Sequence, residues 1–151
     1  MKLSRIKEIL RAEVLWGEEL LDDIEVSNAC GADLMSDILA DNKTKAILLT
    51  GLTHRQIIQT ASMSDFAAIV FVRGKLPNKD VIKLAQQEKL PLLRTRYPLY
   101  ETCGILYQEG LKGDMIRLKE DEHEDILTKP QEELKSINFS YDVKGDDFNN
   151  A

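Results

Sequence analysis

The chain has 151 residues, of which 43% are hydrophobic and 30% are charged. This length suits one domain with an appendage, and the composition excludes disordered and fibrous proteins. The net charge of −6 arises entirely after Gly113, because residues 1–113 carry 15 basic and 15 acidic residues whereas residues 114–151 carry 5 and 11. No basic block exists to neutralise phosphates, so we expect no nucleic-acid partner.

The first third of the chain carries helix, strand and turn signals in alternation. Apolar residues at helical spacing predict a short helix over residues 4–12, with Ser4 as its N-cap. A strand is expected to begin at Val14, and another is expected over residues 24–26 after an Asp-Asp turn. Asp33 stands where a cap for the next helix belongs.

Two continuous apolar runs, residues 46–50 and 67–72, give the strongest strand signals. Such runs are typical of parallel strands that are covered on both faces. A helix signal follows each of them. Thr53 and Gln56 form a capping box after the first run, and apolar residues at helical spacing follow Pro77 after the second.

A third buried strand over residues 90–93 and a last helix over about residues 98–110 complete the pattern. Strands that alternate with helices predict right-handed crossovers and a mainly parallel sheet. The expected fold class is therefore α/β, with helices on both faces of the sheet and residues 1–113 forming the domain.

The character of the chain changes after Gly113. Residues 114–135 are highly charged and contain Pro130, which indicates a charged linker. Residues 136–151 form an acidic tail, in which residues 137–143 alternate between apolar and polar in the manner of a single half-buried strand. Such an isolated strand either adds to an edge of the sheet or begins a second domain that the chain cuts short.

The sequence shows no targeting or membrane signal. The N-terminus lacks an uninterrupted apolar segment, and no apolar run approaches the ~20 residues of a spanning helix. Cys30 and Cys103 lie far apart without CxxC or Cys-His spacing, which argues against a zinc site or a disulfide. We therefore expect a cytoplasmic protein with two reduced thiols, no membrane partner and no cofactor.

Ligands of open parallel sheets bind beyond the carboxyl ends of the strands. The residues that follow the predicted strands combine glycines, hydroxyl groups and basic side chains, which suit an anionic ligand such as a nucleotide. The same residue types also serve to turn the chain and to solvate the rim of a sheet, so both interpretations stand. The candidate ligand-binding residues are Thr50, Gly51, Thr53, Arg55, Arg73, Gly74, Lys75 and Arg94.

No catalytic or metal-binding set is assembled by spacing. The loop after residue 50 matches neither a P-loop nor a GxGxxG fingerprint. His54 is expected to be an exposed first-turn side chain, and His123 lies in a solvated acidic run. We therefore predict no catalytic residue, no metal site and no enzymatic activity. The enzymatic alternative is a small phosphotransfer or hydrolytic enzyme that uses Asp33 and Asp37.

Four stretches together carry a family pattern: GADLMSDILA at residues 31–40, LTGLT at 49–53, FVRGKLP at 71–77, and YETCGILY with the following Gly-Leu at 100–111. Through them, residues 1–113 resemble the DRTGG domain in its short stand-alone bacterial and archaeal form. The Asp-Arg-Thr-Gly-Gly string itself is absent. Thr53-His54-Arg55 stands near its expected place, and Arg55 is the basic residue that carries over.

The resemblance implies a fold like the N-terminal domain of HPr kinase/phosphorylase. Related domains occur in some phosphotransacetylases and between CBS domains in certain inorganic pyrophosphatases, where they are regulatory or help dimerisation and are not the catalytic part. We therefore expect a non-catalytic regulatory domain that senses a small anionic ligand, either a nucleotide or a phosphometabolite, that forms homodimers, or that does both.

The tail carries a second resemblance. Residues 137–151, INFSYDVKGDDFNNA, look like the opening strand and turn of an anti-sigma-factor-type, histidine-kinase-like ATPase domain. This resemblance implies a chain cut short within a longer protein, or one product of a split gene. The alternative function is therefore a protein-interaction module that docks a histidine-kinase-like or anti-sigma-type signalling ATPase.

Overall fold

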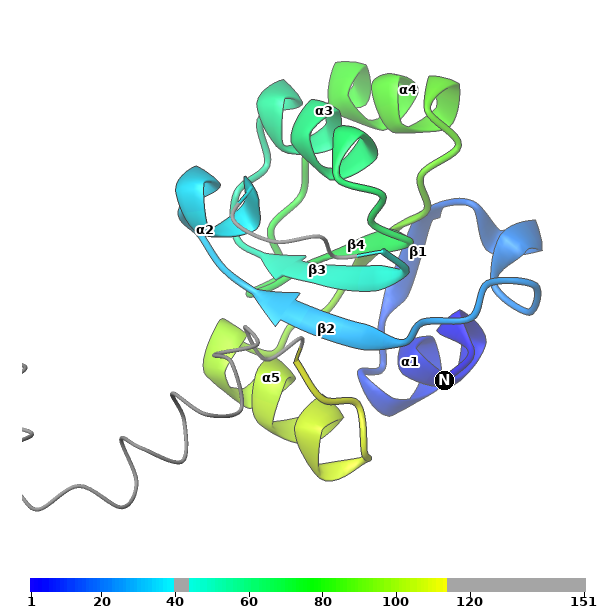
Figure 1. The fold of residues 1–151 in the computed structure, drawn as a ribbon. Coiled ribbons are helices and arrows are strands. Elements are labelled where there is room, and N and C mark those ends of the chain that lie inside the picture. The colour runs from blue at the N-terminus through cyan, green and yellow to red at the C-terminus, as the bar shows by residue number, and fades with distance from the viewer. Residues whose placement is uncertain (40–43, 114–151) are drawn as a thin grey trace, which may run out of the picture. The chain divides into compact units, whose positions relative to one another are not determined.

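Five strands form one sheet in the part of the chain that the structure describes. The computed structural model describes residues 1–39 and 44–113 (Figure 1). The strands are β1 (Glu13–Trp16), β2 (Asn28–Gly31), β3 (Ala46–Thr50), β4 (Ala68–Phe71) and β5 (Leu92–Arg94). They lie in the order β1-β5-β4-β3-β2. Strands β2 to β5 run parallel, and β1 pairs antiparallel with β5.

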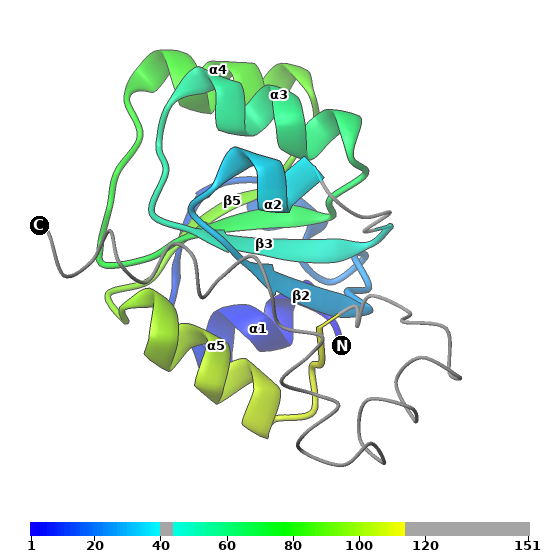
Figure 2. The same cartoon turned by 60° about the vertical axis from the view of Figure 1, so that its left-hand side comes forward.

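Helices cover both faces of this sheet. They are α1 (Leu3–Ile9), α2 (Met35–Leu39), α3 (Arg55–Met63), α4 (Lys79–Gln87) and α5 (Leu99–Gln108), with a short 3₁₀ turn at Glu18–Leu20. Figures 1 and 2 show α2, α3 and α4 on one face and α1 and α5 on the other. The α/β class, with a mainly parallel sheet and helices on both faces, is confirmed.

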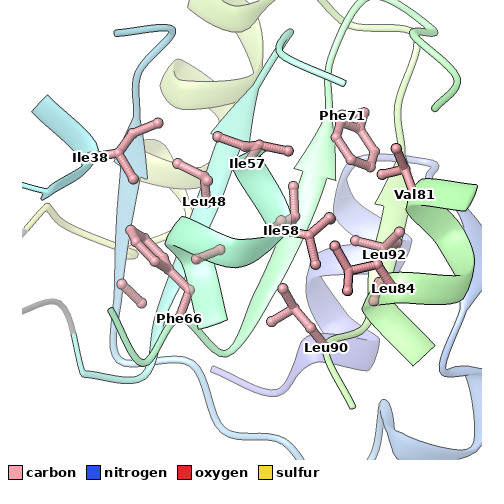
Figure 3. Packing of buried hydrophobic residues seen from close by; sticks show 14 of the residues in the cluster. Ile38, Leu48, Ile57, Ile58, Phe66, Phe71, Val81, Leu84, Leu90 and Leu92 are labelled. Atoms are coloured by element: carbon pink, nitrogen blue, oxygen red, sulfur yellow. The ribbon is translucent and has the colours of Figure 1, made fainter. Parts of the chain in front are cut away.

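The strand residues alternate between two hydrophobic cores. In β3, Leu48 faces the core under α2, α3 and α4, whereas Ile47 and Leu49 face the core above α1 and α5. Figure 3 shows Leu48 with Ile57 and Ile58 in the first of these cores. Every residue of β3 and β4 is buried, which explains why both strands appear in the sequence as unbroken apolar runs.

Four helices end in the same way, with one residue in the left-handed region. These residues are Arg11, Asp65, Lys89 and Gly110, which follow α1, α3, α4 and α5. The next backbone N–H then bonds back to a carbonyl in the last turn, as from Leu90 to Ala85 at 2.9 Å. This is the Schellman motif, which satisfies helix carbonyls that would otherwise lack a donor. The residue that donates is apolar and buried at all four ends: Ala12, Phe66, Leu90 and Leu111.

The second strand differs from its expected position. Residues 24–26 do not join the sheet, because Leu3 N donates to Ile24 O at 3.0 Å and Val26 N donates to Met1 O at 2.7 Å. The strand β2 begins at Asn28 instead and pairs with β3. The expectation was wrong because Val26 is buried, and Ile24 half-buried, against the N-terminal segment rather than in the sheet, whereas the true edge strand contains Asn28 and Gly31.

The helices also begin at residues other than those that the capping patterns predicted. Ser4 lies inside α1, whose N-cap is Lys2. Thr53 precedes the N-cap of α3, which is His54 and makes no side-chain capping bond. The Asp33 carboxylate accepts hydrogen bonds from Thr50, the last residue of β3, and from the backbone N–H of Gly51. Capping patterns therefore found the right helices but not their first residues.

The predictions for the linker at residues 114–135, the tail at 136–151 and the strand at 137–143 lie outside the described residues. Within residues 1–39 and 44–113, none of the helices has the length and apolar character needed to cross a membrane.

The left-handed backbone of Lys89, just after α4, suggests a substitution that should stabilise the domain. Lys89 has φ +54°, a conformation that costs most L-residues about 1 kcal/mol and costs glycine almost nothing. We expect Lys89→Gly to raise the free energy of unfolding by about 0.5–1 kcal/mol in urea denaturation. The matched control is Lys83→Gly in the exposed interior of α4, which should lower it by about 1 kcal/mol. Equal losses in both variants would contradict this account of the helix end.

Candidate functional site

The carboxyl ends of β2, β3, β4 and β5 lie along one edge of the sheet because these strands are parallel. The chain leaves β2, β3 and β4 toward the helices of one face, but it leaves β5 toward α5 on the opposite face (Figure 2). A pocket of about 870 Å³ lies at this edge, and we call it the strand-end pocket. It is lined by Gly31, Asp33, Gly51, Leu52, Val72, Arg73, Lys75, Pro98, Leu99, Tyr100, Glu101 and Cys103.

A small hydrogen-bond network joins the ends of β2 and β3 at the pocket. The hydroxyl of Thr50 donates to Asp33 Oδ1 at 2.9 Å, and Gly51 N donates to the same oxygen at 2.7 Å. Leu52 N donates to Thr50 Oγ1 at 3.2 Å. The Thr50 side chain is fully buried, so the structure commits its hydroxyl to holding two loops together.

The loop after β4 brings two cations to the pocket. Arg73 and Lys75 are exposed and line it, and neither makes an ion pair with another residue of the described ranges. Arg73 has φ +57°, and its backbone N donates to Tyr97 O at 2.9 Å. The loop is therefore fixed to the segment that leads into α5.

Two carboxylates, Asp33 and Glu101, line the same pocket as these cations. The four ionised side chains balance, so the pocket is not simply basic. It presents positive charge for an anion beside acceptors for hydroxyl or amino donors. An organic ligand that carries both kinds of group suits it better than a bare anion does.

A second pocket of about 500 Å³ lies at the same edge, beside β1 and β5. We call it the arginine pocket; Arg94 and Gly74, two of the predicted site residues, line this one rather than the first. Its full lining is Leu10, Arg11, Glu13, Gly74, Arg94, Thr95, Arg96 and Tyr97. The predicted basic rim is therefore divided between two pockets.

Three predicted residues line neither pocket: Thr50, Thr53 and Arg55. Thr53 is half-buried ahead of α3, and Arg55 is exposed as the first residue of that helix. Of the eight predicted residues, the strand-end pocket is lined by Gly51, Arg73 and Lys75, with Thr50 behind them. The structure thus brings some of the predicted set together and separates the rest.

The start of α5 forms a wall that sequence reasoning missed. Leu99, Tyr100 and Glu101 lie in its first turn, where backbone N–H groups lack helical partners. The predicted site contained only residues at or just after the strand ends. The sequence pattern does not show that α5 lies on the opposite face of the sheet from α2, α3 and α4. The one signal that pointed there is Gly31, because a Cβ at this position would overlap Cys103 Sγ of α5.

The two cysteines lie near this contact without forming a disulfide. Burial, and next the neighbouring Cys30, raise the pKa of the Cys103 thiol above its usual value. A thiol with a raised pKa stays protonated at neutral pH and is a poor nucleophile. Cys103 therefore contributes packing rather than chemistry to the pocket.

The residues considered for catalysis do not converge. Asp33 lines the strand-end pocket but Asp37 does not, and His54 is exposed at the start of α3. Within residues 1–39 and 44–113, no group of three or more His, Cys, Asp or Glu side chains is arranged to hold a metal ion. The geometry of the pocket supports ligand binding.

The family model described as the DRTGG domain matches residues 5–108 of the chain. No curated protein gives a significant match. Among solved structures, the chain is similar to the CBS and DRTGG domains of the regulatory region of the Clostridium perfringens pyrophosphatase, in a complex with its activator diadenosine tetraphosphate. The likeness has a TM-score of 0.54 at 15% identity. It covers 90% of this chain and 58% of that one, so this chain spans less than two thirds of that structure.

The close approach of α5 to β2 predicts the effect of adding a methyl group at Gly31. We expect Gly31→Ala to lower the free energy of unfolding by about 1–3 kcal/mol, because the new Cβ overlaps Cys103 Sγ. In a Cys103→Ala background the same substitution should cost less than about 1 kcal/mol. A double-mutant cycle in urea measures this difference. Equal costs in both backgrounds would show that Gly31 matters for another reason.

Proposed function

This chain belongs to the DRTGG domain family, and from that premise we propose that it is a non-catalytic regulatory domain whose strand-end pocket binds a small anionic ligand. One observation carries the proposal. Arg73 and Lys75, which have no ion-pair partner among the described residues, line a pocket together with the first turn of α5. Phosphate groups are stabilised both by such cations and by free N–H groups at a helix start.

The other groups of the pocket favour a nucleotide or a phosphorylated metabolite over an inorganic anion. Asp33 and Glu101 can accept hydrogen bonds from ligand hydroxyl groups, such as those of a ribose. Tyr100 is exposed at the pocket and offers an aromatic surface to a base. The volume of about 870 Å³ lies in the usual range for sites of small organic ligands.

The structural comparison supports a regulatory role for the family. The C. perfringens region that this chain resembles is regulatory, contains a DRTGG domain, and was solved with a nucleotide activator. We propose by extension that ligand binding to this chain controls another activity. That activity would belong to a part of the protein other than the described residues, or to a partner protein. The alternative partner that the tail sequence suggests is a histidine-kinase-like or anti-sigma-type ATPase.

Binding measurements on two charge-removal variants test the proposed ligand site. We expect Arg73→Ala and Lys75→Ala each to weaken nucleotide binding about tenfold or more, because each removes a charge-assisted hydrogen bond to phosphate. Isothermal titration with ATP, with diadenosine tetraphosphate and with sugar phosphates gives the affinities. Lys83→Ala, which removes an exposed cation on α4, is the matched control and should bind within about twofold of the parent.

The same titrations decide the role of Arg55, the basic residue implied by the family resemblance. Because Arg55 lines neither pocket, we expect Arg55→Ala to bind like the control. The proposal fails if the parent protein binds no compound of the series, or if the double variant without Arg73 and Lys75 binds as tightly as the parent.

A second candidate function, homodimerisation, is favoured by the outer face of α5. The side chains of Tyr100 and Tyr107 are 86% and 59% exposed there, and both line an apolar groove of about 540 Å³. Aromatic side chains of this kind are enriched at protein interfaces. Tyr100 also lines the strand-end pocket, so a dimer formed through this groove would be placed to respond to ligand.

Light scattering after size exclusion tests dimerisation through this surface. Tyr107 lies outside the strand-end pocket, so Tyr107→Asp should convert a dimer to a monomer that still binds the ligand. Met63→Asp, which alters an exposed side chain at the end of α3, should leave the mass unchanged. A parent protein that is monomeric at about 100 µM, with and without ATP, would contradict the dimer.

A further inference from the structure

The arginine pocket concentrates positive charge that the fold itself does not use. Three arginines line it, and its one carboxylate belongs to Glu13. Arg94 Nε lies 3.2 Å from Glu13 Oε2, and its Nη2 bonds to the same oxygen. Arg11 and Arg96 are exposed and make no ion pair with the residues of 1–39 and 44–113. Among its ionised groups the pocket therefore has an excess of two positive charges.

The pairing of β1 with β5 explains why two of these charged groups meet. Glu13 is the register partner of Arg94, and their side chains form the ion pair described above. Arg11 is the left-handed residue at the end of α1, two residues before β1, and Arg96 follows β5 by two residues. Both line the same pocket as the ion pair, so two further positive charges are held close to Arg94.

The floor of the arginine pocket is rigid and buried. The hydroxyl of Thr95 is buried and donates to Leu10 O at 2.8 Å, which ties the end of α1 to the end of β5. Thr95 N donates to Phe71 O at 2.9 Å, and Gly74 N donates to Thr95 O at 2.7 Å. The backbone segments that carry the three arginines are thus held in place before any ligand arrives, which lowers the cost of binding.

The arginine pocket is distinct from the strand-end pocket. Gly74 lines the former, while its neighbours Arg73 and Lys75 line the latter. The bonds Gly74 N–Thr95 O and Arg73 N–Tyr97 O join the two loops that stand between the pockets. The charges also differ, because the cations of the strand-end pocket are balanced by two carboxylates and those of the arginine pocket are not.

We propose that the arginine pocket is a second ligand site, which binds the linked phosphates of a compact polyanion through Arg11, Arg94 and Arg96. A guanidinium group binds phosphate oxygens in bidentate fashion, and three such groups match the oxygens of a diphosphate. Two sources share this chemistry: free inorganic pyrophosphate and the diphosphate of a nucleotide. The site does not depend on the proposed strand-end ligand.

Titration calorimetry with inorganic pyrophosphate and with ADP tests the site. We expect Arg11→Ala and Arg96→Ala each to weaken pyrophosphate binding at least about tenfold, since each removes charge-assisted bonds to phosphate. Glu13→Gln should tighten it, because the substitution removes the carboxylate that competes for Arg94. Lys83→Ala and Arg55→Ala, which lie outside this pocket, should bind pyrophosphate within about twofold of the parent.

A comparison of the affinities for ADP and for inorganic pyrophosphate decides which compound supplies the phosphates. If ADP binds at least as tightly as pyrophosphate and loses affinity in the same two variants, the site takes a nucleotide diphosphate. If pyrophosphate is preferred, the site takes the free anion. Either result supports the site, and neither depends on whether ATP binds the strand-end pocket.

A stability readout separates loss of binding from loss of folding. Because the pocket carries an excess of two positive charges, Arg96→Ala should leave the melting temperature unchanged or raise it at low salt, and the difference should shrink in 1 M NaCl. Pyrophosphate should raise the melting temperature of the parent and not that of the Arg11→Ala, Arg96→Ala double variant. The proposal is overturned if the parent binds no pyrophosphate at millimolar concentration, if the folded double variant binds it equally well, or if Arg73→Ala abolishes the binding.

Discussion

The order of the strands is the constraint on which the rest of this structure depends. Strands β2, β3, β4 and β5 lie side by side in the order in which the chain makes them. Right-handed crossovers between such strands must place their helices on one face, so α2, α3 and α4 all cover the same side. The opposite face can be covered only by segments before β2 or after β5, and α1 and α5 take that place (Figure 2). The strand-end pocket forms because the first turn of α5 lies on one face of the sheet, while the loops after β2, β3 and β4 lead to helices on the other face.

The parts of the fold that the sequence predicts well are those with two buried faces. Strands β3 and β4 are nearly unbroken apolar runs because alternate residues enter different cores, and Leu92 and Leu93 of the shorter β5 do the same. The edge strand β2 was misplaced because its residues are only partly buried, and the apolar Ile24 and Val26 gave a competing strand signal just before it. Helix starts were misplaced because Thr53 and Asp33 have the chemistry of caps but bond or lie elsewhere. Tertiary contacts decide such cases, and local patterns do not contain them.

The sequence predicts that the candidate site lies at one edge of the sheet, but it does not predict which residues share a pocket there. Parallel strands bring their carboxyl ends together, so residues such as Gly51, Arg73 and Arg94 were expected at one rim. That they divide between two pockets depends on the backbone bonds between the loop after β4 and the segment after β5, which have no sequence signature. The hydroxyl of Thr50 was expected to face a ligand, whereas the structure buries it in a bond to Asp33. The contribution of α5 follows only from its crossing to the opposite face.

The bonds Arg73 N–Tyr97 O and Gly74 N–Thr95 O give the two pockets a common wall. A common wall allows binding in one pocket to change the binding free energy in the other. If a ligand in one pocket shifts or stiffens these loops, it changes the free energy of binding in the other, and the second ligand must change the first by the same factor. Such reciprocity needs no large rearrangement, because a change in the order of two short loops is sufficient. The response of the domain to either ligand would then depend on the concentration of the other.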